Sequence, residues 1–251
     1  MKIDANSVTF EPQDMAFVKK FGILEATEMA LDYHAEHPNL PFLYDAEQLA
    51  GFLGISRGEL NDIVNHIQKE YKEAHLPKKD GTYRSLCVPS IRLRFCQDPI
   101  KGKILPQLPV SKFATAYQKG STTRGNAEPH IGKKFLLKLD ITDFFGSITF
   151  EQVQRTAFNT RYVSRQVGYL LTSLCCKDDS LPQGAATSPA LSNIVMYRFD
   201  DYIGRWCSQR QIAYTRYCDD MTFSANRPLY GVYQKVKTML REMGFELNES
   251  K

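Results

Sequence analysis

The sequence lacks the features that would place it in several large classes of protein. Among its 251 residues, no apolar run approaches the roughly 20 residues that a helix needs to span a bilayer. The first residues, MKIDANSVTFEPQD, contain no apolar segment of the kind found in secretory signal peptides. The sequence therefore indicates a cytoplasmic protein with no membrane partner.

Cysteine and histidine patterns that would bind zinc are also missing. The six cysteines form no CxxC pair, and the five histidines are scattered along the chain. We therefore expect reduced thiols. No internal repeat or low-complexity tract is visible, and a hydrophobic fraction of 43% is ordinary for a protein with a sizeable core.

Charge is small in total but unevenly distributed. The net charge is +4, yet residues 66–134 contain 14 Lys or Arg and 5 Asp or Glu, a local balance of +9. The rest of the chain is therefore acidic. A basic region followed by an acidic one is typical of a protein that binds a polyanion close to a carboxylate metal site. A solvated charged surface gives the same pattern.

The first half of the chain is predicted to be mainly helical. Apolar residues recur at helical spacing over 12–36 and again over 46–63, with a break at NLPF (39–42). Residues 49–64 have the pattern of a helix-turn-helix DNA reader, but the same pattern is common in helical packing units. Asp80-Gly81 lies between two short strand-like runs, which predicts a hairpin over 76–90.

The second half alternates strands with helices. We expect a buried strand over 135–141, one helix that Ser188-Pro189 begins and that runs past Trp206, and two strands with a tight acidic turn over 212–225. A helix ended by Gly244 and a last short strand, FELN, follow. This order predicts an α+β fold, with an antiparallel or mixed sheet backed by helices.

The strongest chemical signal is a set of three carboxylates. Asp219 and Asp220 stand at the tip of the predicted hairpin, and Asp140 ends the other central strand. Adjacent strands would bring all three together, and a divalent cation would relieve their mutual repulsion. Mg²⁺ prefers such oxygen ligands, and two ions can activate a 3′-hydroxyl and stabilise a leaving pyrophosphate. An Asp-Asp pair by itself is more often a solvated turn.

Three motifs give the sequence a family resemblance. YCDD (217–220) resembles the YxDD box of reverse transcriptases, LDITDFFGSIT (139–149) looks like their first palm motif, and LPQGAATSPALSN (181–193) looks like the motif between them. The resemblance implies a right-hand polymerase fold, with N-terminal helices and basic fingers in 1–134 and a palm in 135–251. The two would form one continuous domain of an RNA-directed DNA polymerase.

The resemblance also implies roles for individual residues. Asp140, Asp219 and Asp220 would be catalytic and, with the Ile141 carbonyl, would hold two Mg²⁺ ions. A ring at Phe145 would act as a steric gate against the ribose 2′-hydroxyl, although Phe144 could exchange roles with it. Residues expected to bind the incoming dNTP are Lys78, Lys79, Arg84, Phe145, Gln183, Gly184 and Lys251.

A finer match points to one branch of the family. GNAEPHIG (125–132) resembles the NAxxH motif typical of retron reverse transcriptases, which implies template RNA contacts by Arg124, Asn126 and His130. Retron enzymes make multicopy single-stranded DNA as an RNA–DNA hybrid from a structured non-coding RNA, and act with an effector protein in anti-phage defence. The chain stops at ELNESK, before the family's helical thumb, so we expect the thumb to be missing.

Two groups of alternatives share most of these features. Reverse transcriptases of group II introns, diversity-generating elements and abortive-infection systems would use the same palm chemistry. A non-catalytic nucleic-acid-binding relative would keep the fold alone, but pure binding does not need three converging carboxylates.

Overall fold

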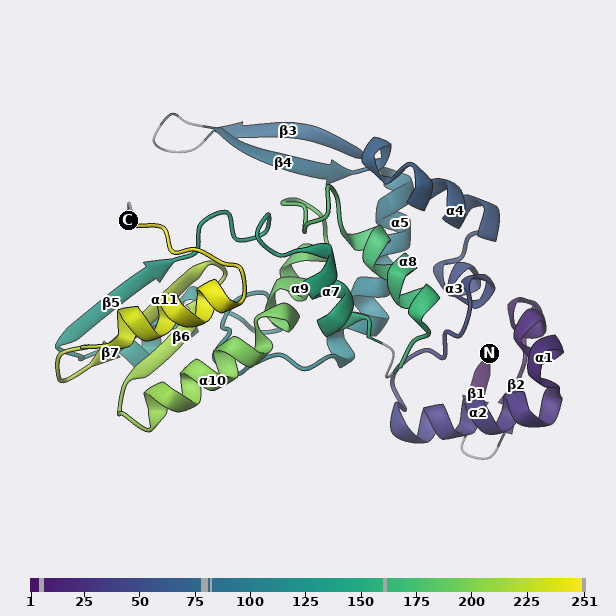
Figure 1. Ribbon diagram of the computed structural model, residues 1–251, viewed down its shortest axis with the longest axis horizontal. Coiled ribbons are helices and arrows are strands. Elements are labelled where there is room, and N and C mark those ends of the chain that lie inside the picture. Colours follow the sequence, from purple (N-terminus) through teal and green to yellow (C-terminus); the bar gives the residue numbers. More distant parts are fainter. Residues whose placement is uncertain (5–6, 78–80, 82, 160–161, 250–251) are drawn as a thin grey trace. The chain divides into compact units, whose positions relative to one another are not determined.

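A computed structural model describes residues 1–251 except 5–6, 78–80, 82, 160–161 and 250–251 (Figure 1). The chain forms two compact units, one made of residues 1–108 and 150–188 and the other of residues 109–149 and 189–251. Within the described part of the chain, no helix is long and apolar enough to cross a bilayer. The predicted division into fingers (1–134) and palm (135–251) stays a prediction.

The first unit is mainly helical. Its strands are β1 (Lys2–Asp4), β2 (Ser7–Thr9), β3 (Tyr71–Pro77) and β4 (Tyr83–Pro89). Its helices are α1 (Met15–Phe21), α2 (Ile23–Glu36), α3 (Ala46–Leu53), α4 (Arg57–Asn65), α5 (Ile91–Pro99), α7 (Phe150–Ala157) and α8 (Arg165–Cys175). Short 3-10 or π turns cover Pro12–Asp14, Ile67–Glu70, Ile100–Ile104 and Leu105–Gln107.

Helix α8 is the centre of this unit, since α3, α4, α5 and α7 all pack against it. The predicted single helix over 12–36 is wrong in one respect, because Gly22 has a φ of 81° and separates α1 from α2. The helix-turn-helix pattern predicted over residues 49–64 is confirmed as a pair of helices: Gly54 between them is left-handed, and Ser56 caps α4 with a capping box.

The α3–α4 pair does not have the surface of a DNA reader. Arg57 at the start of α4 forms an ion pair with Glu47, and Asp62 on its exposed face is paired with Arg92. The cations near α4 are therefore already engaged by carboxylates, and the helix-turn-helix alternative gains no support.

The second unit is built on a three-stranded sheet. Its strands are β5 (Phe135–Asp140), β6 (Ala213–Tyr217) and β7 (Asp220–Ala225), in the order β5-β7-β6 with both pairs antiparallel. Its helices are α6 (Thr123–Ala127), α9 (Ser188–Val195, whose first residue belongs to the other unit), α10 (Tyr197–Ser208) and α11 (Val232–Glu242), with a 3-10 turn at Glu128–His130. The predicted antiparallel sheet is confirmed.

Strand alternation gives this sheet a polar and an apolar face. Asp140, Asp220 and Tyr217 are aligned across the three strands, whereas Leu137, Phe223 and Tyr214 are aligned on the other face. The apolar face forms the core: Phe223 is fully buried and stacks on Tyr214, and α10 packs against β6. The metal-binding residues predicted from the sequence therefore point away from the core.

Three sequence predictions need correction in this unit. The sequence predicts a buried strand over 135–141, but β5 is an edge strand, and Phe135 and Leu136 are 42% and 58% exposed. The helix that begins at Ser188 is not continuous as far as Trp206, because a turn at Met196 separates α9 from α10. The last predicted strand, FELN, is wrong, because residues 245–248 contribute only an isolated bridge between Leu247 and Ile141. The two strands around YCDD are confirmed.

Candidate active site

The three predicted carboxylates lie together in the second unit. Asp140 and Asp220 are direct partners in the β5–β7 register, and Asp219 lies in the turn that precedes β7. One ligand oxygen of each lies within 4.8 Å of the others. Asp140 is 7% exposed, whereas Asp220 lies at the surface. Hard oxygen ligands in a compact, partly open group fit a divalent cation such as Mg²⁺.

Backbone hydrogen bonds hold this cluster in place. The amide of Ile141 donates to the carbonyl of Asp219 at 3.2 Å, which ties the end of β5 to the acidic turn. Asn248 donates its backbone amide to the Asp140 carbonyl at 2.8 Å and its side-chain amide to Asp140 Oδ2 at 3.1 Å. The position of Asp140 is therefore fixed from two sides before any metal binds.

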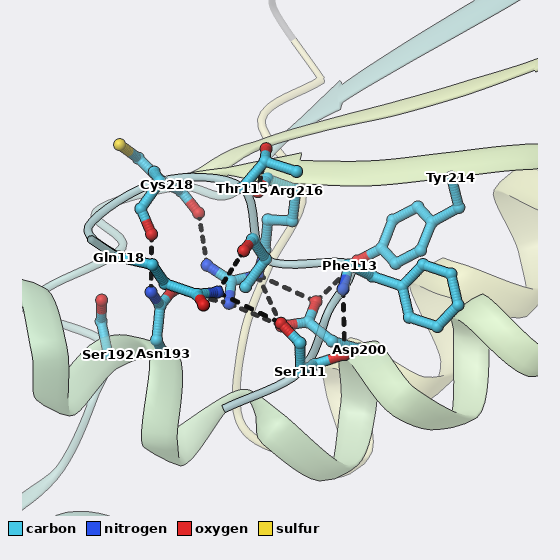
Figure 2. A network of polar contacts seen from close by, with 12 residues as sticks. Ser111, Phe113, Thr115, Gln118, Ser192, Asn193, Asp200, Tyr214, Arg216 and Cys218 are labelled. Carbon is cyan, nitrogen blue, oxygen red and sulfur yellow. Dashed lines mark hydrogen bonds and ion pairs between the residues drawn. The ribbon is translucent and has the colours of Figure 1, made fainter. Parts of the chain in front are cut away.

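The acidic turn rests on a buried arginine on the opposite face of the sheet (Figure 2). Arg216, fully buried on β6, donates from Nη1 to the carbonyl of Cys218 at 2.8 Å, and Cys218 itself has a left-handed φ of 60°. From Nη2 it donates to Asp200 Oδ2 on α10 at 2.6 Å and to Asn193 Oδ1 on α9 at 3.1 Å. One guanidinium thus links the turn to two helices.

The Arg216–Asp200 pair is fully satisfied although it lies in the core. Both side chains are 0% exposed, and Tyr214 donates a further hydrogen bond to Asp200 at 2.7 Å. Burial alone would lower the pKa of Arg216, but the Asp200 carboxylate and its hydrogen bonds raise it above its ordinary value. The arginine therefore stays charged, as a buried ion pair requires.

Sequence reasoning missed this network. A signal was present, because a single Arg in the otherwise uncharged strand AYTRY, directly before YCDD, is unexpected at a buried position. Its partners could not be identified, because Asn193 and Asp200 lie 23 and 16 residues away on separate helices.

Four aromatic rings form the next part of the candidate site. Phe144 is 4% exposed and packs against Phe245, with the Arg216 guanidinium 5.7 Å from its ring centroid. Phe145 is only partly buried, and its ring lies 5.5 Å from that of Phe144 and 6.5 Å from that of Tyr117. The buried Phe144 is thus a core residue, and Phe145 is the ring that faces outward.

The nucleotide-binding residues predicted at Gln183 and Gly184 lie in the first unit with the β3–β4 hairpin. The amide of Cys87 on β4 donates to the Gln183 carbonyl at 2.7 Å. Gly184 has a φ of 122°, and a Cβ at this position would lie 2.8 Å from the Cys87 carbonyl oxygen. The close approach of the two backbones therefore requires glycine. Arg84 lies on β4 with an exposed side chain.

Three further predicted residues, Lys78, Lys79 and Lys251, lie outside the residues that the structure describes. Their proposed triphosphate contacts stay predictions.

The NAxxH residues are engaged inside the second unit. Asn126 Oδ1 accepts a hydrogen bond from the Thr115 hydroxyl at 2.6 Å, and the His130 ring lies between Ser224 at 2.7 Å and Thr215 at 2.9 Å. Burial, with the nearby Lys133 and Lys138, lowers the pKa of His130 below 6.5. The motif thus fastens residues 122–131 to β6 and β7.

These contacts bear on the RNA-binding role predicted for the motif. Both ring nitrogens of His130 already have partners, whereas the Arg124 side chain is exposed on α6. Contact with the template RNA stays a prediction for all three residues.

The antiparallel sheet, its helices and the acidic cluster together make up the palm of a right-hand polymerase fold. A telomerase from Candida albicans, solved in complex with the TWJ fragment of telomeric RNA, shares this fold with a TM-score of 0.50 at 14% identity. The match covers 74% of this chain and 43% of that chain. The predicted fold class is confirmed.

The chain belongs to the reverse transcriptase (RNA-dependent DNA polymerase) family, whose sequence profile matches residues 76–251. It is 30% identical over 204 residues to the retron Ec86 reverse transcriptase of Escherichia coli, and 32% identical over 236 residues to the retron Mx65 reverse transcriptase of Myxococcus xanthus. These matches cover 80% and 84% of this chain, which spans 63% and 55% of the two relatives. The predicted retron-type resemblance is confirmed.

Proposed function

We propose that this chain carries the polymerase site of a retron-type RNA-directed DNA polymerase. The observation that supports this most is the cluster of Asp140, Asp219 and Asp220 on the polar face of the palm sheet. A protein that only bound nucleic acid has no need of three carboxylates within 4.8 Å of one another, because they repel a polyanion as well as each other, and a divalent cation relieves this repulsion.

The carboxylates and the Ile141 carbonyl would hold two Mg²⁺ ions. Such ions, when bound, activate the primer 3′-hydroxyl and stabilise the leaving pyrophosphate. The chain's own part is to keep its ligands in place. The hydrogen bonds of Ile141 and Asn248 with this cluster fix its backbone, and Arg216 holds the turn from behind.

The remaining residues would select and orient the dNTP. The outward-facing Phe145 ring would lie under the sugar and crowd a ribose 2′-hydroxyl. Gly184 would let the backbone approach the nucleotide, and the Gln183 side chain would bond to it. The exposed Arg84, together with Lys78 and Lys79 of the same hairpin and Lys251, would bind the triphosphate.

The retron relatives support a narrower proposal about the product. We place the chain in the cytoplasm, where it would copy a structured non-coding RNA into multicopy single-stranded DNA and act with an effector protein against phage. Sequencing of the nucleic acid that co-purifies with the full-length protein tests this. A single dominant branched RNA–DNA species is expected, and a random mixture of cellular RNA would contradict it.

The polymerase activity is tested by primer extension on an RNA template with dNTPs, using the full-length protein. We expect primer extension that requires Mg²⁺ and that yields an RNA–DNA hybrid. A protein that binds the primer–template but never extends it, in Mg²⁺ or Mn²⁺, would instead be a non-catalytic relative.

A further inference from the structure

Tyr117 has an unusual backbone for its residue type. Its φ is 62°, in the left-handed region that bulky side chains rarely adopt. Strained residues of this kind persist only where the surroundings hold them, and they cluster at functional sites.

Hydrogen bonds on both sides hold Tyr117 in this conformation. The preceding carbonyl, of Ala116, accepts from Asn193 Nδ2 at 2.8 Å, the same side chain that accepts from Arg216. The following residue, Gln118, donates its backbone amide to Ser121 Oγ at 3.1 Å, and its side chain reaches back to the carbonyl of Ala114. The network behind the acidic turn therefore also fixes Tyr117.

The same segment is paired with the strand that leads into the turn. Arg216 donates its amide to the Phe113 carbonyl at 2.8 Å, and its own carbonyl accepts from the amide of Thr115 at 2.8 Å. Residues 113–117 thus run beside β6, and a displacement of one would displace the other.

The conformation places the Tyr117 side chain beside another aromatic ring of the candidate site. Its ring lies 6.5 Å from the Phe145 ring. Yet 43% of the residue is exposed. A tyrosine that served only to fill the core would be buried, so the ring is available to define the wall of a binding site.

We infer that Tyr117 is a specificity-determining residue, which holds the Phe145 ring in place and is itself held, through Asn193, by the arginine behind the turn that carries Asp219. The Phe145 ring has two aromatic neighbours, the buried Phe144 and the exposed Tyr117. Removal of the exposed ring gives Phe145 room to rotate away from the sugar. The inference rests on the proposed function, and it assigns Tyr117 to the choice between deoxyribo- and ribonucleotides.

The test compares incorporation of a dNTP and of the matching rNTP by the full-length protein. Tyr117→Gly removes the ring and suits the positive φ, so the protein should fold as stably as the wild type. Tyr117→Phe keeps the ring and loses the hydroxyl. Tyr230→Ala, which removes a tyrosine that is 89% exposed in the same unit, is the control.

We expect Tyr117→Gly to reduce the ratio of kcat/KM for dNTP over rNTP about tenfold, the rate equivalent of one aromatic contact. Tyr117→Phe should keep the wild-type ratio, because it keeps the ring. In a Phe145→Ala background, Tyr117→Gly should change the ratio little, since it acts through the ring that is already absent.

A wild-type ratio in Tyr117→Gly would overturn the inference. If kcat/KM fell equally for both nucleotides, so that the ratio stayed the same, Tyr117 would have a purely structural role. If the wild type itself extends no primer, the proposed function fails first, so the two failures are distinguishable.

Discussion

The guanidinium of Arg216 and the carboxylate of Asp200 form an ion pair with both side chains 0% exposed, at 2.6 Å between Nη2 and Oδ2. The pair lies on the face of the sheet opposite Asp220. Its hydrogen bond to Cys218 makes it the internal support of the acidic turn.

Arg216→Ala is therefore expected to lower the free energy of unfolding by about 3–5 kcal/mol, because it leaves the Asp200 carboxylate buried without its partner. Urea denaturation followed by circular dichroism measures this. The control is Arg205→Ala, which breaks an exposed pair with Asp201 and should cost only about 0–1 kcal/mol. Equal small losses in both variants would show that the buried pair contributes little.

His130 should make stability depend on pH. Its pKa in the folded protein lies below 6.5, so the unfolded chain binds more protons in the window between the folded pKa and 6.5. The contribution of His130 is complete above 6.5 and is lost as pH falls through the folded pKa. The melting temperature should therefore drop between about pH 7.5 and about pH 5.5.

His130→Gln should flatten that pH dependence, whereas His75→Gln, at an exposed histidine on β3, should leave it unchanged. If the melting temperature changed with pH equally in the wild type and in His130→Gln, His130 would not be the cause of the pH dependence.

Gly184→Ala should impair the nucleotide binding that we propose for Gly184. Its positive φ and the short distance to the Cys87 carbonyl predict a stability loss of about 1–3 kcal/mol and a higher KM for dNTP. Gly102→Ala is the matched control, because nothing lies within 4 Å of the added Cβ there. Thermal melting measures the stability loss, and steady-state incorporation measures KM. A wild-type KM in Gly184→Ala would argue against a close approach of the Gly184 backbone to the nucleotide.

The sequence predicts the features of the candidate site that depend on short stretches of the chain. Short sequence patterns predict Asp140 at a strand end and Asp219-Asp220 in a tight turn. Antiparallel strand pairing then brings the three residues together. Gly184 is singled out by its motif alone, but the reason that the structure gives for a glycine there is the close approach of Cys87, which lies far away in the sequence. Its contact with the nucleotide stays a prediction.

What the sequence does not predict depends on distant partners. Arg216 needs Asp200 and Asn193 on two helices, and the strain at Tyr117 is visible only in backbone geometry. The apolar run FLLKLD predicts a buried strand, yet β5 lies at a sheet edge. Strand order is decided by the whole unit, and periodicity alone does not give it.

The central claim is that three carboxylates of one palm catalyse RNA-templated DNA synthesis. Single-turnover extension of an RNA-templated primer by the full-length protein tests it most directly, with Asp140→Asn, Asp219→Asn and Asp220→Asn measured beside Asp143→Asn. Asp143 is an exposed acid of the same loop, with a φ of 40° that asparagine tolerates. We expect each of the first three variants to lose at least about a thousandfold in rate while melting normally, and Asp143→Asn to keep its activity. Extension at the wild-type rate by Asp219→Asn or Asp220→Asn would contradict the account.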